Sequence, residues 1–141
     1  MMKKDLTYFI SGHRDLTEQQ FEDLYIPMIN EILATNPQPY FVVGDCKGVD
    51  SFAQDYLKTL VALNRIHPSQ VTVYHMFEKP RYLASDEFRV IGGWQSDVER
   101  DTAMTNASFR DIAFIHPGAW TSGTAQNILR RFEISSLNKS E

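Results

Sequence analysis

The sequence has a single cysteine, Cys46, in 141 residues, which excludes an intramolecular disulfide and any cysteine-based metal cluster. No apolar run approaches the length of a membrane span, and the charged N-terminus lacks the apolar segment of a secretory signal. Basic residues are outnumbered, 14 against 18 acidic ones, which gives a formal net charge of −4. A basic face for nucleic-acid binding is therefore not expected, and the sequence predicts a cytoplasmic protein without membrane contacts.

The composition is typical of a globular domain, because 43% of the residues are apolar and 12% are aromatic. Short β-prone segments alternate with helical apolar stripes; Thr17 and Gln20 form a capping box before the first helix, which Pro27 is expected to break. This alternation predicts a three-layer, Rossmann-like α/β fold with a parallel sheet. We expect a single domain over 1–141, with its core at about 6–135 and strands at 6–10, 40–43, 71–74 and 112–116.

The segment 77–96 lacks clear periodicity and carries two arginines, Arg81 and Arg89, and two aromatic residues, Tyr82 and Trp94. Loops of this length are uncommon in compact domains unless they are functional or disordered. We expect a lid or a pocket wall here. A surface insertion without a role in the site is the alternative.

Two loops that follow predicted strands are candidates for ligand binding, because open parallel sheets bind ligands at the carboxyl ends of their strands. In the first loop, Gly12 permits a tight turn, and Ser11 and Arg14 can donate to a phosphate or sugar oxygen. The second loop precedes a helix N-terminus, which favours anions. Its spacing is neither that of a P-loop nor that of a dinucleotide-binding motif, so a polar turn with a helix-capping aspartate is the alternative. Its candidate ligand-binding residues are Gly44, Asp45, Lys47, Gly48 and Asp50.

A third candidate segment joins an early-helix arginine, Arg100, to the last strand, a glycine-containing turn and another helix start. Free backbone N–H groups and hydroxyls at that helix start favour an anion. We expect all three segments to meet around one anion-accepting cavity at one edge of the sheet. The candidate ligand-binding residues of the turn and helix are Gly118, Ser122, Gly123, Thr124 and Asn127.

The four histidines, His13, His67, His75 and His116, show no metal-binding spacing, so the sequence predicts no protein-bound metal and no cofactor. His116 is the one histidine expected near the pocket, because it ends a predicted strand beside the glycine-containing turn.

Together the three segments resemble the SLOG superfamily, the Rossmann-like group that includes DprA, the LOG phosphoribohydrolases and the YspA-like domains. Residues 11–15 are similar to the S-G-S/H-R-D start of the YspA-like branch, and residues 44–50 to its G-G-A-R-G-A-D motif. Residues 122–125 also resemble the S-G-T-A-x-E motif of nucleoside 2-deoxyribosyltransferases. The resemblance spans about residues 6–131. The LOG pattern E-R-K-x-x-M … P-G-G-x-G-T-x-x-E is matched by Glu99, Arg100, Met104, Pro117, Gly118, Gly123 and Thr124.

This resemblance implies a nucleotide-type ligand, such as a nucleoside monophosphate or ADP-ribose, with phosphate on the glycine turns and Arg100 near the sugar or phosphate. In the LOG and deoxyribosyltransferase branches, a glutamate closes the last motif and acts at the N-glycosidic bond. Asn127 stands at that position here, and an amide can neither attack as a carboxylate nor stabilise an oxocarbenium ion by charge. The turn before it is also two residues longer than in the LOG pattern.

We therefore expect a nucleotide-binding sensor or sequestering protein. The alternative is an N-glycosidase or transferase that uses another carboxylate; Glu99 and Asp101 are the first catalytic candidates, and Asp45 and Asp50 are further ones. Single-stranded nucleic-acid binding in the manner of DprA is disfavoured by the acidic charge balance. Homo-oligomers are common in the superfamily, and Trp120 is a candidate for either an interface or base stacking, as is Trp94.

Overall fold

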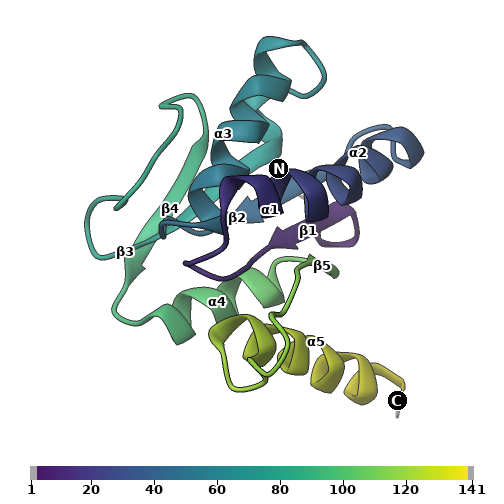
Figure 1. Ribbon diagram of the computed structural model, residues 1–141, viewed down its shortest axis with the longest axis vertical. Coiled ribbons are helices and arrows are strands. Elements are labelled where there is room, and N and C mark those ends of the chain that lie inside the picture. Colours follow the sequence, from purple (N-terminus) through teal and green to yellow (C-terminus); the bar gives the residue numbers. More distant parts are fainter. Residues whose placement is uncertain (1–2, 140–141) are drawn as a thin grey trace.

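Five strands form one parallel sheet in the computed structural model, which describes residues 3–139 (Figure 1). The strand order is β4-β3-β2-β1-β5, and every neighbouring pair is parallel, so the predicted α/β class is confirmed. The strands are β1 (Thr7–Ile10), β2 (Tyr40–Val43), β3 (Val71–Met76), β4 (Arg89–Trp94) and β5 (Arg110–Ile112).

Helices cover both faces of the sheet and complete the predicted three layers (Figure 1). Alternating side chains of β1 explain these layers. Tyr8 and Ile10 pack into the larger core with α1, α2 and α3, whereas Phe9 packs with Met104 of α4 on the other face, and α5 lies against α4. The helices are α1 (Glu18–Leu24), α2 (Ile26–Thr35), α3 (Val49–Ala62), α4 (Asp97–Asn106) and α5 (Gly123–Lys139), with short 3-10 helices η1 (Lys4–Leu6) and η2 (Pro68–Gln70).

The start and the break of the first helical region follow from its sequence. The Thr17 hydroxyl accepts the Gln20 N–H at 3.1 Å, and the Gln20 side chain accepts the Thr17 N–H at 2.9 Å, so the predicted capping box is present. The helix is interrupted at Tyr25, and Pro27 lies in the first turn of α2, where its missing N–H costs no hydrogen bond.

The segment 77–96 differs from the expected lid, because its last residues form the edge strand β4, paired in parallel with β3. Both faces of β4 are largely exposed, so the strand has no apolar alternation that sequence analysis could detect. Gly92 is needed because a Cβ there would collide with the His75 ring. The rest of the segment is a loop that packs against the loop after β2, where Arg81 contacts Asp45.

Strand β5 spans Arg110–Ile112 and shares only Ile112 with the strand predicted at 112–116, because the chain leaves the sheet after Ile112. The Phe114 N–H donates to the Tyr25 hydroxyl at 2.9 Å, and the His116 N–H donates to His13 Nε2 at 2.9 Å. These contacts direct the loop after β5 towards the loop after β1. Within residues 3–139, no helix has the length and apolar character that crossing a membrane requires.

Candidate functional site

A cavity of about 450 Å³ opens at the carboxyl end of β1, lined by the loops after β1 and β2, by α4 and by the start of α5. The strand order makes this the point where the chain reverses direction across the sheet, because β2, β3 and β4 follow on one side of β1 and β5 lies on the other. All three predicted segments contribute to the cavity. Of the predicted residues, those that line it are Ser11, Gly12, Arg14, Asp50, Arg100, Asp101, Gly123, Thr124 and Asn127.

The two glycines of the second loop lie behind the cavity rather than in its lining. A Cβ at Gly44 would stand 2.5 Å from Asp50 Oδ2 and 3.1 Å from Arg100 Cζ, so the glycine makes room for these two side chains. Gly48 has φ +83°, and a Cβ there would be 2.5 Å from the Arg14 carbonyl oxygen. The Val49 N–H also donates to the His13 carbonyl at 3.3 Å. This turn therefore packs against the first loop.

Two other predicted residues cap helices. The exposed Glu99 carboxylate accepts the Gln95 N–H at 3.4 Å, while the Ser96 hydroxyl accepts the Glu99 N–H at 3.1 Å at the start of α4. The Ser122 hydroxyl accepts the Ala125 N–H at 3.1 Å at the start of α5. Glu99 is thus away from the cavity lining, and the Ser-x-x-Glu pattern was the sequence signal for its capping contact.

The remaining predicted residues and the two tryptophans lie outside the 450 Å³ cavity. Lys47 and Asp45 line a neighbouring hollow of about 430 Å³ with Arg81. Gly118 is exposed, with φ +85° in the turn after β5. The partly buried Trp94 stacks on Tyr74, with ring centroids 5.2 Å apart, whereas Trp120 is exposed.

One wall of the cavity is a network of arginines and aspartates centred on Arg100, which is only 4% exposed. Arg100 Nη1 donates to Asp45 Oδ1 at 2.8 Å and lies 3.3 Å from Asp97 Oδ1, and its Nη2 donates to Asp101 Oδ1 at 3.0 Å. Arg81 binds the same Asp45 carboxylate through its guanidinium and its backbone N–H. The positive charge of Arg100 is therefore already neutralised by protein carboxylates.

Burial and charge act in opposite directions on the carboxyl groups of this network. Burial raises the pKa of Asp45, but the hydrogen bonds from Arg81 and the charge of Arg100 outweigh it and hold the pKa below its usual range. For Asp50, the nearby charges and hydrogen bonds offset the effect of burial on the pKa less completely. Burial raises its pKa to about 7, against the attraction of Arg100 and the hydrogen bond from the Cys46 N–H. Burial, with Asp50 nearby, also raises the pKa of the Cys46 thiol, which argues against a nucleophilic thiolate there.

The facing wall, from the end of β1 and the start of α5, is less fully hydrogen-bonded. The Ser11 residue is 6% exposed, and its hydroxyl has no hydrogen-bond partner among the described residues. Gly123 and Thr124, in the first turn of α5, line the same space. Asn127 lies one turn further on, where its amide donates to Asp101 Oδ2 at 3.2 Å and accepts from Arg130 at 2.7 Å. The amide at position 127 therefore holds a carboxylate supplied by α4.

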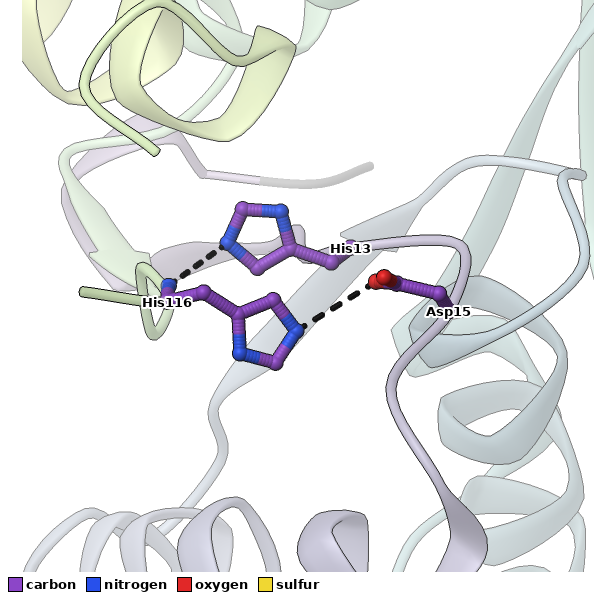
Figure 2. A group of neighbouring side chains, drawn as sticks. All are labelled: His13, Asp15 and His116. Atoms are coloured by element: carbon purple, nitrogen blue, oxygen red, sulfur yellow. Dashed lines mark hydrogen bonds and ion pairs between the residues drawn. The ribbon is translucent and has the colours of Figure 1, made fainter. Parts of the chain in front are cut away.

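Three residues near the mouth form a cluster that the spacing of histidines could not reveal. His13 and His116, from the loops after β1 and β5, stack with ring centroids 4.3 Å apart, and Asp15 lies 3.3 Å from His116 Nε2 (Figure 2). Burial and the neighbouring His116 lower the pKa of His13, and Asp15 opposes this. Only the adjacency of β1 and β5 brings these residues together, and strand order is not written in local sequence.

No protein-family model matches the chain, and neither do any of the curated proteins or solved structures. The likeness to the SLOG superfamily thus rests on the short motifs alone. Fold and cavity define the chain as a Rossmann-like α/β protein with a polar pocket at its topological switch point.

Proposed function

We propose that the protein binds a small nucleotide-type ligand, such as a nucleoside monophosphate or an ADP-ribose derivative, in the 450 Å³ cavity at the carboxyl end of β1, as a sensor or sequestering protein. The observation that carries the proposal is Ser11, which lines the cavity and whose buried hydroxyl has no hydrogen-bond partner among the described residues. A buried polar group left unpaired costs about 1–3 kcal/mol, which a ligand oxygen would recover on binding.

The start of α5 supports a position for the phosphate. Gly123 and Thr124 lie at the first turn of a 17-residue helix and beside Ser11 in the cavity lining, where backbone N–H groups and the helix dipole favour an anion. The guanidinium of Arg100 is saturated by carboxylates and is a poorer phosphate partner than its sequence position suggests. We therefore assign the phosphate to the α5 side of the cavity.

The carboxyl groups on the other wall support recognition of a sugar. Asp50 and Asp101 line the cavity, and carboxylate oxygens accept hydrogen bonds from ribose hydroxyls. A volume of about 450 Å³ lies within the range of roughly 300–1,000 Å³ that small-molecule sites occupy. Size and polarity are thus consistent with a mononucleotide.

A second candidate function, N-glycosidic hydrolysis, is favoured by the same two carboxyl groups. Glycosidic hydrolysis uses one carboxylic acid with a raised pKa and one carboxylate. Asp50, whose pKa is about 7, would donate a proton to the leaving base, and Asp101, paired with Arg100, would stabilise the positive charge on the sugar. Water adds its hydroxyl to C1′ as the C1′–N bond breaks, and its proton returns to Asp50.

The two functions are separated by incubating the protein with nucleoside monophosphates and ADP-ribose while recording melting temperature and free base. We expect at least one compound to raise the melting temperature without release of base. If Asp101→Asn abolishes an observed release, the protein is a glycosidase. If no compound in the panel changes the melting temperature and none is cleaved, the nucleotide proposal is wrong.

Ser11→Ala tests the residue that carries the proposal. It should reduce the ligand-induced rise in melting temperature, because it removes the unpartnered hydroxyl that we assign to ligand binding. Thr105→Val is the matched control: Thr105 Oγ1 is also buried and has no partner among the described residues, but Thr105 lies outside the cavity lining. An equal ligand response in the wild type and Ser11→Ala would remove the support that Ser11 gives.

A further inference from the structure

Three side chains with metal-binding chemistry meet where the loops after β1 and β5 touch (Figure 2). One ligand atom from each of His13, Asp15 and His116 lies within 4.8 Å of the other two. Nitrogen and oxygen atoms that bind one Zn²⁺ at about 2.0–2.2 Å lie roughly 3.3 Å apart in a tetrahedral site. His116 Nε2 and Asp15 Oδ1 already have this separation, 3.3 Å, and the exposed Asp15 side chain can adjust to the position of His13.

We infer that His13, Asp15 and His116 bind a divalent transition-metal ion of the Zn²⁺ class. Two imidazoles and one carboxylate suit Zn²⁺ and its neighbours in the first transition row, whereas Mg²⁺ and Ca²⁺ prefer sites made of oxygen atoms. A set of three protein ligands leaves at least one coordination position for water or a ligand, as in catalytic metal sites. The inference is independent of whether the cavity binds a nucleotide.

The surrounding contacts hold the two histidines in place. The His13 carbonyl accepts the Val49 N–H at 3.3 Å, which fixes the first loop against α3. The His116 ring packs edge-on against Phe114, with centroids 5.8 Å apart. The Asp15 side chain is 84% exposed, so it is free to turn towards an incoming ion. Two ligands are therefore pre-positioned, and the third can close the site.

The neighbouring cations are paired with carboxylates and therefore oppose a metal ion little. His13 and Asp15 line the same cavity as Arg100, whose charge is balanced by Asp45, Asp97 and Asp101. Arg14, the neighbouring cation on this loop, is paired with Asp97 at 3.0 Å, which offsets its repulsion of a metal.

Coordination has a structural consequence that distinguishes this site from adventitious binding. His13 Nε2 now accepts the His116 backbone N–H at 2.9 Å, which leaves Nδ1 to carry the ring proton. If the metal takes Nδ1, that proton moves to Nε2, and the hydrogen bond to His116 must break. Metal binding is therefore expected to shift the backbone amide resonance of His116.

The test is titration of the chelator-treated, full-length protein with Zn²⁺ by calorimetry, and with Mg²⁺ as a control metal. We expect one Zn²⁺ to bind per chain, no comparable binding of Mg²⁺, and a shift of the His116 amide signal in a ¹H–¹⁵N spectrum. Absence of Zn²⁺ binding to the wild-type protein, or binding that leaves the His116 amide unmoved, would overturn the inference.

Variants locate the site. His13→Ala, His116→Ala and Asp15→Asn should each weaken Zn²⁺ binding about tenfold or more, since each removes a ligand. His67→Asn is the matched control, because His67 lies outside the cluster and asparagine can still cap η2. Asp15→Asn keeps the test valid if a histidine variant misfolds, because this exposed side chain is not needed for packing. Wild-type affinity in any of the three correctly folded variants would refute the three-ligand site.

Discussion

The two walls of the cavity differ in how fully the protein itself satisfies their polar groups. On the α4 side, Arg100 and Arg81 are bound by the carboxylates of Asp45, Asp97 and Asp101, so charge is balanced within the protein. On the β1–α5 side, the Ser11 hydroxyl has no partner among the described residues. The α4 side, here called the saturated wall, stabilises the fold, because its charged groups are already bound to one another. The β1–α5 side, here called the open wall, offers a ligand more, because a ligand can form a hydrogen bond there that the protein lacks.

Arg100→Ala should show the largest effect and tests the saturated wall. Loss of this buried guanidinium leaves Asp101 without its cationic partner and Asp45 with Arg81 alone, and breaking a buried ion pair costs about 3–5 kcal/mol of the free energy of unfolding. Arg14→Ala is the control, because its pair with Asp97 is exposed and worth about 0–1 kcal/mol. Urea denaturation of both variants measures the difference. Equal, small losses would mean that Arg100 is available for a ligand after all.

Asp50 gives the saturated wall a dependence on pH. Its folded pKa of about 7 lies above the ordinary value of 3.8, so the folded protein holds this proton more tightly and loses stability as pH rises from about 4 through 7. Arg100, Asp45, Asp101 and the Cys46 N–H all act on it. Asp50→Asn cannot ionise, so it should be more stable than the wild type at pH 8, by about 4 kcal/mol for a difference of roughly three pKa units at about 1.4 kcal/mol each.

Denaturation of Asp50→Asn and the wild type across pH 4–8 checks this expectation. The difference between the two proteins should shrink towards pH 4, where the wild-type carboxyl is protonated in the folded state. A constant difference at all pH values would show that Asp50 does not titrate in this range.

Gly48→Ala should have an intermediate effect and tests whether the second loop serves packing. Its φ of +83° and the Arg14 carbonyl 2.5 Å from an added Cβ predict a loss of about 1–3 kcal/mol without any ligand. Gly123→Ala is the matched glycine of the open wall, where an added Cβ meets nothing within 4 Å and stability should be kept. A thermal melt of each variant suffices. If Gly48→Ala is as stable as the wild type, Gly48 is not needed for packing, and its predicted role in ligand binding stands.

The sequence predicted the fold where the physics is local. Thr17 caps its helix through a residue three positions away, Pro27 lies in the first turn of the helix that follows the break, and the apolar run at 40–43 forms a buried strand. The edge strand β4 was missed, because neither of its faces is buried and its sequence therefore lacks the alternation of apolar and polar residues that predicts a strand. Strand β5 was predicted too late in the chain, at 112–116 instead of Arg110–Ile112, because Phe114 packs against the core from a loop rather than from a strand.

For the site, the meeting of three loops could be predicted because parallel strands end at one edge of the sheet. The partners of individual side chains could not be predicted. That Arg100 would be neutralised by Asp45, 55 positions earlier, or that His13 would stack on His116, depends on strand order and on rotamers that no local pattern encodes.

The smallest effect on stability is expected for the open wall. Ser11→Ala should leave the ligand-free protein as stable as the wild type or slightly more stable. The variant removes a buried hydroxyl that, among the described residues, has no hydrogen bond to offset its desolvation. Thr105→Val removes the other such hydroxyl, away from the cavity, and should behave alike without ligand. The two variants should then diverge when a nucleotide is added, with only Ser11→Ala losing response. If Ser11→Ala instead destabilises the ligand-free protein markedly, the hydroxyl has a hydrogen-bond partner within the protein. The polar groups of both walls would then be satisfied without a ligand.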